Sequence, residues 1–574
     1  MPFWDSCADF SRGRPRLVLL ALVGILCQLV VVDHQSDAGP YGGGSKMIAS
    51  PFRYLLLILA FAFVLDVIVA DSMSQTMDEG DHLEYGRRIL RGQPDRSGPY
   101  MDIKTPITAL NAFPRAIGVR FDSRSFPRIR KFFSSLTLAR IPSILAGLAL
   151  IGFIYQIAYE LYGRVAALSA ALLAALSPNL IAHGTLATTD GYFALGVISA
   201  LYFFRRYLLQ PTLANACVSG LALALAQITK PLVVYLYPIE GIFLIAAATV
   251  GRRWIKITGK DLAISSAVTA ACSICVLNVA YLFDRTFAPL SSYHFETSAF
   301  RSLQKPWFMD KVRVPFPYPV LQGLDMAQRH DETGVTYGNV YLQGALRSVN
   351  GPGSHGFRDY YLVVWLVKEP IPLQILFIWG LIQICRRRRN GGFLFSECLL
   401  LVSSGVLVLW LSLFSKAQIG IRHILPALAI EVIIGAATFS EWASFSRSQK
   451  TALALLLVWL AASAFSYYPN MIPYMNEWVP DRKLSYQILA DSNLDWGQNL
   501  GLVRNFLKNN PDVVLNPDLP VSGRILVSAN RLVGVVPKDK GPLLWALRYR
   551  PVGHVGYAHL LFEIPPKDLA VRSR

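Results

Sequence analysis

The stretch Thr76-Met77-Asp78-Glu79-Gly80-Asp81-His82-Leu83-Glu84 comes just after an apolar run, Tyr54 to Ala70, that is long enough to cross a lipid bilayer. Four carboxylates and one histidine therefore lie close to the end of a membrane span. Charge in such a place is costly unless it is paired or has a function. The stretch thus predicts a membrane protein whose first loop carries chemistry, with Asp78 as the candidate base.

The composition agrees with a polytopic membrane protein. Of the 574 residues, 53% are hydrophobic and only 16% are charged, and the mean hydropathy is +0.39, whereas soluble domains carry about 25% charged residues. The net charge of +18 would suit nucleic acid, but the basic residues form short clusters between apolar runs, as cytoplasmic loops do. We therefore expect no nucleic-acid partner. Most of the seven cysteines lie in or beside apolar segments, which argues against a disulfide framework.

About eleven apolar segments follow from Tyr54 onward, each judged against the roughly 20 residues that a bilayer requires. They cover approximately residues 54–70, 137–158, 164–182, 190–208, 213–229, 231–250, 261–283, 361–384, 394–414, 424–440 and 451–468. If the chain before Tyr54 is inside, the inner loops carry most basic clusters, and the loops 71–136 and 284–360 lie outside. We therefore predict an all-α polytopic membrane domain over residues 47–468.

The two ends of the chain depart from this pattern. Within residues 1–46, the apolar segment Leu17–Val32 is flanked by arginines, like a signal sequence. Either this is a cleaved or extra signal-like segment, or translation starts at Met47, which we favour. The tail, 469–574, is polar enough for a small extracytoplasmic α/β domain. Its predicted elements are a helix over Asn499–Lys508 and strands over Arg524–Ser528, Arg531–Val536 and Val555–Ile564.

The acidic loop has a structural and a functional interpretation. Thr76 and Glu79 have the spacing of a helix capping box, and acidic residues favour the first turn of a helix. A capping box accounts for Glu79 but leaves Asp78 as surplus negative charge beside lipid. A second acidic site, Thr188-Thr189-Asp190, begins another span on the same face. Two carboxylates that meet there would make a base, a cation site, or both.

Several basic residues are predicted at the same depth as these carboxylates. They are Arg140 in Leu-Ala-Arg-Ile-Pro, Lys230 in Ile-Thr-Lys-Pro, Lys368 in Val-Lys-Glu-Pro and Arg422 in Gly-Ile-Arg-His. A lone lysine at this depth usually extends to the lipid headgroups. Several cations that face a carboxylate cluster instead indicate a pocket for a phosphate held at the membrane surface.

A set of motifs occurs in one order along the chain. They are Asp78-Glu79 with His82, Leu138-Ala-Arg-Ile-Pro-Ser143, Leu186-Ala-Thr-Thr-Asp-Gly191, Ile228-Thr-Lys230, Tyr341-Leu-Gln-Gly344, Trp365-Leu-Val-Lys-Glu-Pro370 and Gly420-Ile-Arg-His-Ile-Leu-Pro426. The set resembles the GT-C glycosyltransferases and, more narrowly, the protein O-mannosyltransferase-like, lipid-carrier-dependent glycosyltransferase family 39, over residues 54–565. Asp491-Ser-Asn-Leu-Asp-Trp-Gly-Gln498 resembles a signature of a bacterial branch with an extended C-terminal region. Gly80-Asp81 departs from the best-known members, which bears on the acceptor type rather than the reaction.

The resemblance implies a GT-C fold with amphipathic outer-loop helices. It also implies inverting transfer of a sugar from a polyprenyl-phosphate carrier to a hydroxyl of a protein, lipid or glycan, at the extracytoplasmic side of the cell (inner) membrane. By the motif match Asp78 would deprotonate the acceptor, and Glu79 and Asp190 would order the site, with a divalent cation as a candidate cofactor. Cations that would hold the carrier phosphate are Lys230, Arg422 and Arg140. Further substrate-binding candidates are His82, Lys368, His423, Asp495 and Trp496.

The alternative is a polytopic transporter or lipid flippase, which would also have many spans and intramembrane carboxylates. Transporters typically contain internal repeats and a binding site at the membrane midplane. This sequence shows no convincing similarity between its halves, and its polar residues gather at the outer boundary. We therefore favour the transferase.

Overall fold

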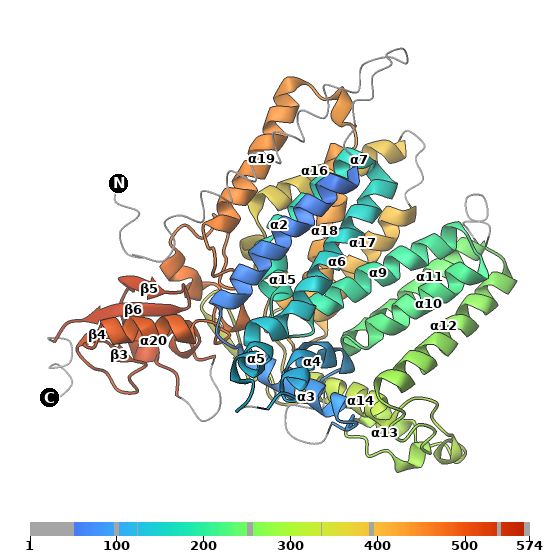
Figure 1. Ribbon diagram of the computed structural model, residues 1–574, viewed down its shortest axis with the longest axis horizontal. Coiled ribbons are helices and arrows are strands. Elements are labelled where there is room, and N and C mark those ends of the chain that lie inside the picture. The colour runs from blue at the N-terminus through green and yellow to red at the C-terminus, as the bar shows by residue number, and fades with distance from the viewer. Residues whose placement is uncertain are drawn as a thin grey trace.

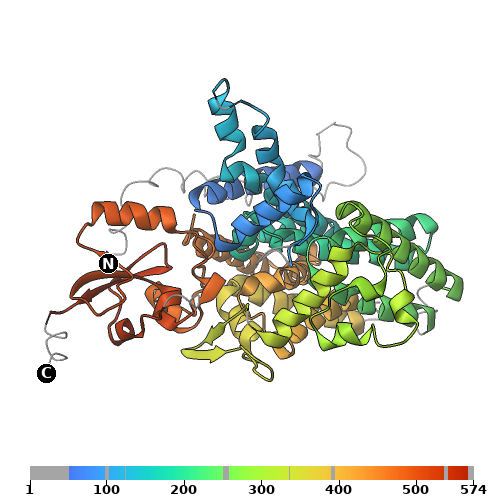
Figure 2. The ribbon, with the colours of Figure 1, turned by 90° about the horizontal axis from the view of Figure 1, so that it is seen from below.

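The computed structural model describes residues 51–96, 103–122, 124–249, 257–334, 336–389, 395–535 and 541–566. The predictions for residues 1–46 and for a start at Met47 lie outside these ranges. The described chain is mostly helical, with a small sheet domain at one end of the molecule in both views (Figures 1 and 2).

Eight helical segments are long and apolar enough to cross a membrane. They are Phe52–Ser72, Pro127–Tyr162, Asp190–Leu209, Pro231–Thr249, Gly259–Ala280, Phe395–Leu413, Ile421–Phe439 and Arg447–Phe465. Two bent pairs add up to two further spans, and α10 (Leu213–Gln227) is apolar but shorter. The multi-pass helical fold is thus confirmed. The count of eleven spans is not, because the described residues contain eight, or ten if each bent pair is one span.

The two bent pairs correct the predicted continuous spans 164–182 and 361–384. The chain bends by 62° between α7 (Arg164–Leu176) and α8 (Pro178–Gly184), and by 110° between α15 (Tyr360–Lys368) and α16 (Ile371–Arg389). Each break contains a proline, Pro178 or Pro370, which lacks an amide hydrogen and disfavours helix in the residue before it. The hydropathy of these segments is continuous, so it hides both breaks.

The centre of the membrane domain is α18 (Leu425–Gly435), which lies among α6, α7, α9, α16 and α17 (Figure 1). Of the span Ile421–Phe439, 94% is buried. The helices around it are α6 (Leu136–Tyr162), α9 (Asp190–Leu209) and α17 (Phe395–Leu413), and α7 presents many alanines to them. Small residues let membrane helices approach closely. This central helix is preceded directly by the short turn η7 (Ile421–Ile424), which carries Arg422.

The remaining membrane helices lie farther from α18, and α12 (Gly259–Ala280) packs against α10 and α11 (Leu236–Thr249) at one edge of the molecule (Figure 1). These remaining helices are α2 (Pro51–Ser72), η3 (Pro231–Tyr235) with α11, α12 and α19 (Arg447–Phe465). The loop predicted over 284–360 contains α13 (Ser298–Ser302), α14 (Tyr318–Thr333) and an antiparallel pair, β1 (Asn339–Leu342) with β2 (Ala345–Ser348).

The first loop is helical and packs against the ends of the membrane helices. It contains α3 (Met77–Leu90), η2 (Pro106–Thr108), the strongly amphipathic α4 (Ala109–Gly118) and α5 (Pro127–Phe133). Gly86 of α3 lies so close to the carbonyl of Thr108 that a Cβ atom would overlap it, so glycine is required at this contact. In Figure 2 the part of this loop that follows α3 projects from the body of the molecule.

The tail forms a four-stranded sheet in the order β3-β4-β6-β5, with α20 (Leu500–Asn509) beside it (Figure 1). The strands are β3 (Val514–Leu515), β4 (Gly523–Ser528), β5 (Gly553–Val555) and β6 (His559–Ile564). The predicted strand Arg531–Val536 is wrong: Ala529–Val533 is the short helix α21, which ends at Gly534 in a left-handed conformation. The predicted strand Val555–Ile564 is interrupted, because Gly556 and Tyr557, both at positive φ, turn the chain between β5 and β6.

Candidate active site

Glu79 is part of the scaffold that holds the first loop. Its carboxylate receives the backbone N–H of Thr76 at 2.8 Å, as the capping box predicts, and the backbone N–H of Ala187 at 2.8 Å. Arg140 donates from Nε to Oε1 at 2.7 Å and from Nη2 to Oε2 at 2.6 Å, and both side chains are fully buried. Arg140 also donates to the carbonyl of Ala70 in the last turn of α2 and to those of Met73 and Ser74, which follow α2. Glu79 and Arg140 are therefore committed to each other and to backbone groups.

Asp78, the preceding residue, contacts a different cation. Its Oδ2 accepts a hydrogen bond from Nη1 of Arg422 at 2.7 Å, which joins the first loop to the start of the central helix. Burial raises the pKa of Asp78, but the charges of Arg422 and Lys104 outweigh burial and bring that pKa well below its usual value. Asp78 is therefore ionised in this arrangement.

Asp190 continues the charged row. It is the first residue of α9, and its Oδ1 is ion-paired with Lys230, while Oδ2 receives the hydroxyl of Thr188 at 3.1 Å. Arg422 Nη1 lies 4.0 Å from Asp190 Oδ2. The pKa of Lys230 is lowered, mainly because the side chain is buried. Carboxylates and cations thus alternate in the order Asp78, Arg422, Asp190 and Lys230.

Lys104 joins this row, although its sequence context did not identify it. It is 8% exposed, and its charge lowers the pKa of Asp78 and of His82. The neighbouring Thr105 donates its hydroxyl to the carbonyl of Thr229 at 2.8 Å, so the segment of Lys104 is fixed beside that of Lys230. The only local signal is a lysine before Thr-Pro within the acidic loop, and such a signal is too common to select it.

The segment Asp491–Gln498 brings the tail into the site. The Arg422 guanidinium lies over the Trp496 ring, with Cζ 4.1 Å from the centroid, and Trp496 is almost fully buried. The carbonyl of Trp496 accepts the backbone N–H of Met77 at 3.0 Å, next to Asp78. Asp495 faces away, toward the sheet, because it accepts the hydroxyl of Ser528 at 2.6 Å. The structure therefore brings Trp496 to the site and leaves Asp495 in the scaffold.

The three other predicted substrate-binding residues, Lys368, His82 and His423, differ in their burial and in their hydrogen bonds. Lys368 is fully buried and donates to the carbonyls of Ile472 and Asn493, each at 2.7 Å, so it links α15 to the tail. His82 is buried, its Nδ1 has no hydrogen-bonding partner among the described residues, and burial lowers its pKa. His423 follows Arg422 and is partly exposed.

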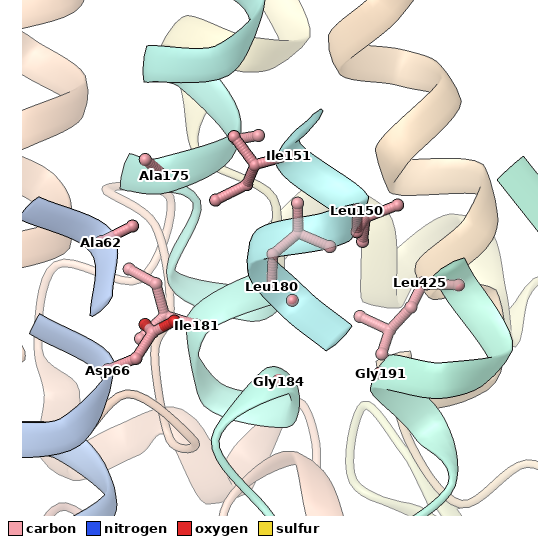
Figure 3. A pocket seen from close by; sticks show the side chains of 13 residues that line it. Ala62, Asp66, Leu150, Ile151, Ala175, Leu180, Ile181, Gly184, Gly191 and Leu425 are labelled. Carbon is pink, nitrogen blue, oxygen red and sulfur yellow. The ribbon is translucent and has the colours of Figure 1, made fainter. Parts of the chain in front are cut away.

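A small cavity lies next to the site, between α2, α6, α7, α8 and α9. Its volume is about 30 Å³, and it is lined mainly by small and aliphatic side chains, with Asp66 as its one charged lining residue (Figure 3). Asp66 is 7% exposed and has no hydrogen-bonding partner in the part of the chain that the structure describes. The wall of the cavity includes Gly191, the neighbour of Asp190.

The residues predicted to share a divalent cation do not fit that role. Both oxygens of Glu79 are occupied by donors from Arg140, Thr76 and Ala187. Asp190 is paired with a cation instead of a second carboxylate. Over the described ranges, no group of three or more His, Cys, Asp or Glu residues has a geometry that would hold a metal ion.

These features define a class: a multi-pass membrane protein with a buried row of alternating charges where several membrane helices end. Residues 128–280 match the family described as dolichyl-phosphate-mannose-protein mannosyltransferase. This match confirms, over these residues, the resemblance to the protein O-mannosyltransferase-like, GT-C family that the motifs indicate. Comparison with curated proteins gives no significant match.

Several solved structures have a similar path of the chain. ArnT from Cupriavidus metallidurans, described as bound to undecaprenyl phosphate, is 13% identical, with a TM-score of 0.44 over 89% of this chain and 98% of that chain. The Archaeoglobus fulgidus oligosaccharyltransferase in its apo form is 15% identical, with a TM-score of 0.49 over 77% and 58%. The Saccharomyces cerevisiae protein O-mannosyltransferase Pmt1-Pmt2 complex, described as bound to the sugar donor, is 11% identical, with a TM-score of 0.48 over 80% and 93%.

Proposed function

We propose that this protein is an inverting glycosyltransferase that moves a sugar from a polyprenyl-phosphate carrier to an acceptor hydroxyl, at the extracytoplasmic face of the cell membrane. The observation that carries the proposal is the set of contacts around the Arg422 side chain. Its Nη1 bonds Asp78 at 2.7 Å and its plane lies on Trp496, yet its buried Nε has no hydrogen-bonding partner among the described residues. A guanidinium held in this way offers a planar set of donors that matches a phosphate.

The donor class follows from the charges and from the family. The matched family's description names a dolichyl-phosphate-linked mannose, which is a sugar on a polyprenyl phosphate. In this proposal Lys104 and Lys230 flank Arg422 and neutralise the phosphate as it becomes the leaving group. Fixed positive charge where negative charge develops is an effective form of transition-state stabilisation. A site at the ends of membrane helices also lets the carrier chain stay in the bilayer.

Asp78 is the proposed base. In inverting transfer the acceptor oxygen attacks the anomeric carbon, the bond to the phosphate oxygen breaks, and one carboxylate takes the hydroxyl proton, so no covalent enzyme intermediate is required. Arg422 and Lys104 lower the pKa of Asp78. A donor phosphate that engages Arg422 draws part of this positive charge away, which raises the pKa of Asp78 toward the range of an effective base.

Glu79 and Arg140 have a supporting role in this proposal. They fix the start of α3, and thereby the direction of Asp78, through contacts to α2 and to Ala187. No step passes through a divalent cation. We further propose that residues 47–468 form the catalytic membrane domain, and that residues 469–574 form an extracytoplasmic domain that closes one side of the site.

The test is sugar transfer in membranes from radiolabelled polyprenyl-phosphate sugars, comparing the native protein with Asp78→Asn. We expect the variant to insert and fold normally and to lose turnover by several orders of magnitude. Glu84→Gln is the matched control, because Glu84 lies on the same helix and pairs with Arg87 away from the site. Full activity of Asp78→Asn would remove the proposed base, and loss of activity in both variants would assign the effect to α3 as a whole.

A further inference from the structure

The helices α4 and α5 form a hairpin, residues 109–133, that the proposed chemistry does not use. In Figure 1 both helices lie where membrane helices end, and Figure 2, which views the molecule from that end, shows the hairpin extending sideways from the body. Only Ser134 and Ser135 separate α5 from α6, and the two helices belong to one apolar segment, Pro127–Tyr162. The hairpin therefore lies at the boundary of the lipid around the membrane helices.

The hairpin carries a concentration of positive charge. Residues 115–131 contain six basic residues and a single acidic one, Asp122. The Asp122 carboxylate accepts the backbone N–H groups of Arg124 at 3.1 Å and Ser125 at 2.8 Å, so it stabilises the local turn. Four of the arginines are exposed, and none of the four forms an ion pair with a carboxylate in the part of the chain that the structure describes: Arg115, Arg120, Arg124 and Arg128. Clusters of this kind attract the headgroups of anionic lipids.

Large apolar side chains are exposed on the same hairpin. Six of them are between 41% and 61% exposed: Leu110, Phe113, Val119, Phe126, Ile129 and Phe132. Phe126, Ile129 and Phe132 recur every three residues and so lie along one side of α5, while Arg128 and Lys131 fall on its other side. An apolar side flanked by cations is typical of helices that lie in the interface between lipid and water.

The rest of the hairpin is fixed to the membrane domain. Asn111 of α4 donates to the carbonyl of Ala139 at 2.7 Å and to the hydroxyl of Ser143 at 2.9 Å, both on α6. Within the hairpin, the rings of Phe121 and Phe133 are stacked with their centroids 5.9 Å apart. The exposed arginines and aromatic side chains are therefore presented by a folded unit whose position relative to α6 is set.

We propose that the α4–α5 hairpin is a binding surface for anionic phospholipids of the surrounding membrane, with its exposed arginines on the headgroup phosphates and its exposed apolar side chains among the acyl chains. The inference goes beyond sugar transfer, because it concerns the bulk lipid and not the carrier. It also links lipid composition to the active site. Gly86 of α3 packs against Ala112 of α4, so a hairpin held on the lipid surface also holds α3, which carries Asp78.

The experiment measures hydrogen–deuterium exchange of the full chain in nanodiscs of phosphatidylcholine alone, and of phosphatidylcholine with one third phosphatidylglycerol, without donor or acceptor. We expect peptides from the hairpin to exchange at least about fivefold more slowly with phosphatidylglycerol, the effect of one arginine attracted to an anionic surface. Peptides from α20 should exchange equally in both. At about 1 M salt, where the screening length is roughly 3 Å, the difference should disappear.

Arg124→Gln/Arg128→Gln should lose most of this protection, whereas the matched control Arg504→Gln/Lys508→Gln, which removes two exposed cations of α20, should keep it. Equal exchange of the native hairpin in both lipid mixtures overturns the inference, as does a lipid effect that persists at 1 M salt. Both results come from the native protein, so they hold even if a variant fails to fold. Full protection in Arg124→Gln/Arg128→Gln also overturns it, and protection that requires an added protein acceptor would assign the surface to that acceptor instead.

Discussion

Replacement of Glu79, which pairs with Arg140, tests whether this carboxylate is structural or catalytic. Glu79→Gln keeps the size of the side chain but replaces one acceptor oxygen by an NH₂ group. Five donors reach the carboxylate: Nε and Nη2 of Arg140, the backbone N–H groups of Thr76 and Ala187, and the Thr76 hydroxyl. Two of them converge on Oε1 and three on Oε2, so either orientation of the amide sets donors against donors.

The expected loss of stability in Glu79→Gln follows from the number of these donors and from the burial of the pair. Both side chains are fully buried, so Glu79→Gln also leaves the Arg140 charge without a counter-charge. Breaking a buried pair from one side costs about 3–5 kcal/mol. At roughly 2 °C per kcal/mol for larger domains, the apparent Tm should fall by about 6–10 °C. Arg524→Ala breaks an exposed pair with Asp512 and should cost less than about 1 kcal/mol.

The assay is thermal unfolding in nanodiscs, followed by loss of the monodisperse peak on gel filtration, together with transfer activity measured well below the transition. Glu79→Gln should lose stability and retain much of its activity at low temperature. A variant as stable as Arg524→Ala but without activity would refute this reasoning and assign Glu79 a catalytic role. The double variant Glu79→Gln/Arg140→Gln should lose less than the sum of the two single losses, because no unpaired charge remains.

Three other predictions concern the donor site. Arg422→Ala should weaken binding of the polyprenyl-phosphate donor at least tenfold more than binding of the acceptor; equal effects on both constants would argue against its phosphate role. Lys104→Ala should weaken donor binding about tenfold and reduce its dependence on salt, because one charge contact is lost, whereas the exposed Lys131→Ala should change neither. Transfer activity should be unchanged after extensive treatment with EDTA, because both oxygens of Glu79 are occupied by protein donors; activity lost to EDTA and restored by Mg²⁺ or Mn²⁺ would contradict the arrangement described.

Local patterns in the sequence account for much of the fold and part of the site. Hydropathy located the membrane helices, because a bilayer selects for apolar length. The capping-box spacing placed the start of α3 and identified the bond between Glu79 and the Thr76 backbone. Predicted depth brought Asp190 and Lys230 to one face, and the structure pairs them. Each of these inferences depends on neighbours within one turn or one span.

Contacts between distant segments were not predictable in this way. Arg422 and Arg140 were predicted at the same depth in the membrane, which did not show that their partners differ. In the structure Arg422 pairs with Asp78, whereas Arg140 is enclosed by Glu79 and the end of α2. Lys104 reaches the site through the hydrogen bond of Thr105 with Thr229, a partner 124 positions away. Trp496 meets Arg422 only because the tail folds back over η7. Spacing along the chain contains no information on such pairs.

The helix breaks explain why so many polar groups gather at one end of the membrane domain. Irregular backbone at membrane depth is tolerated only where protein groups or a water-filled cavity satisfy it. The break after α15 exposes the carbonyls of Leu366, Lys368 and Glu369, and all three receive amide donors. Asn179, beside the other break, donates to Lys368, and Asn476 of the tail donates to the other two.

Asn179 therefore joins the two breaks, and the tail satisfies the remaining carbonyls of the break after α15. Because the tail also carries Trp496 to Arg422, the groups that satisfy the break after α15 and the ring that holds the proposed phosphate-binding cation belong to the same part of the chain. It follows that the tail contributes to the stability of the membrane domain as well as to its site. Asn476→Ala should therefore lower both the thermal stability and the affinity for the polyprenyl-phosphate donor, while a loss of stability alone would show that the breaks and the site are independent.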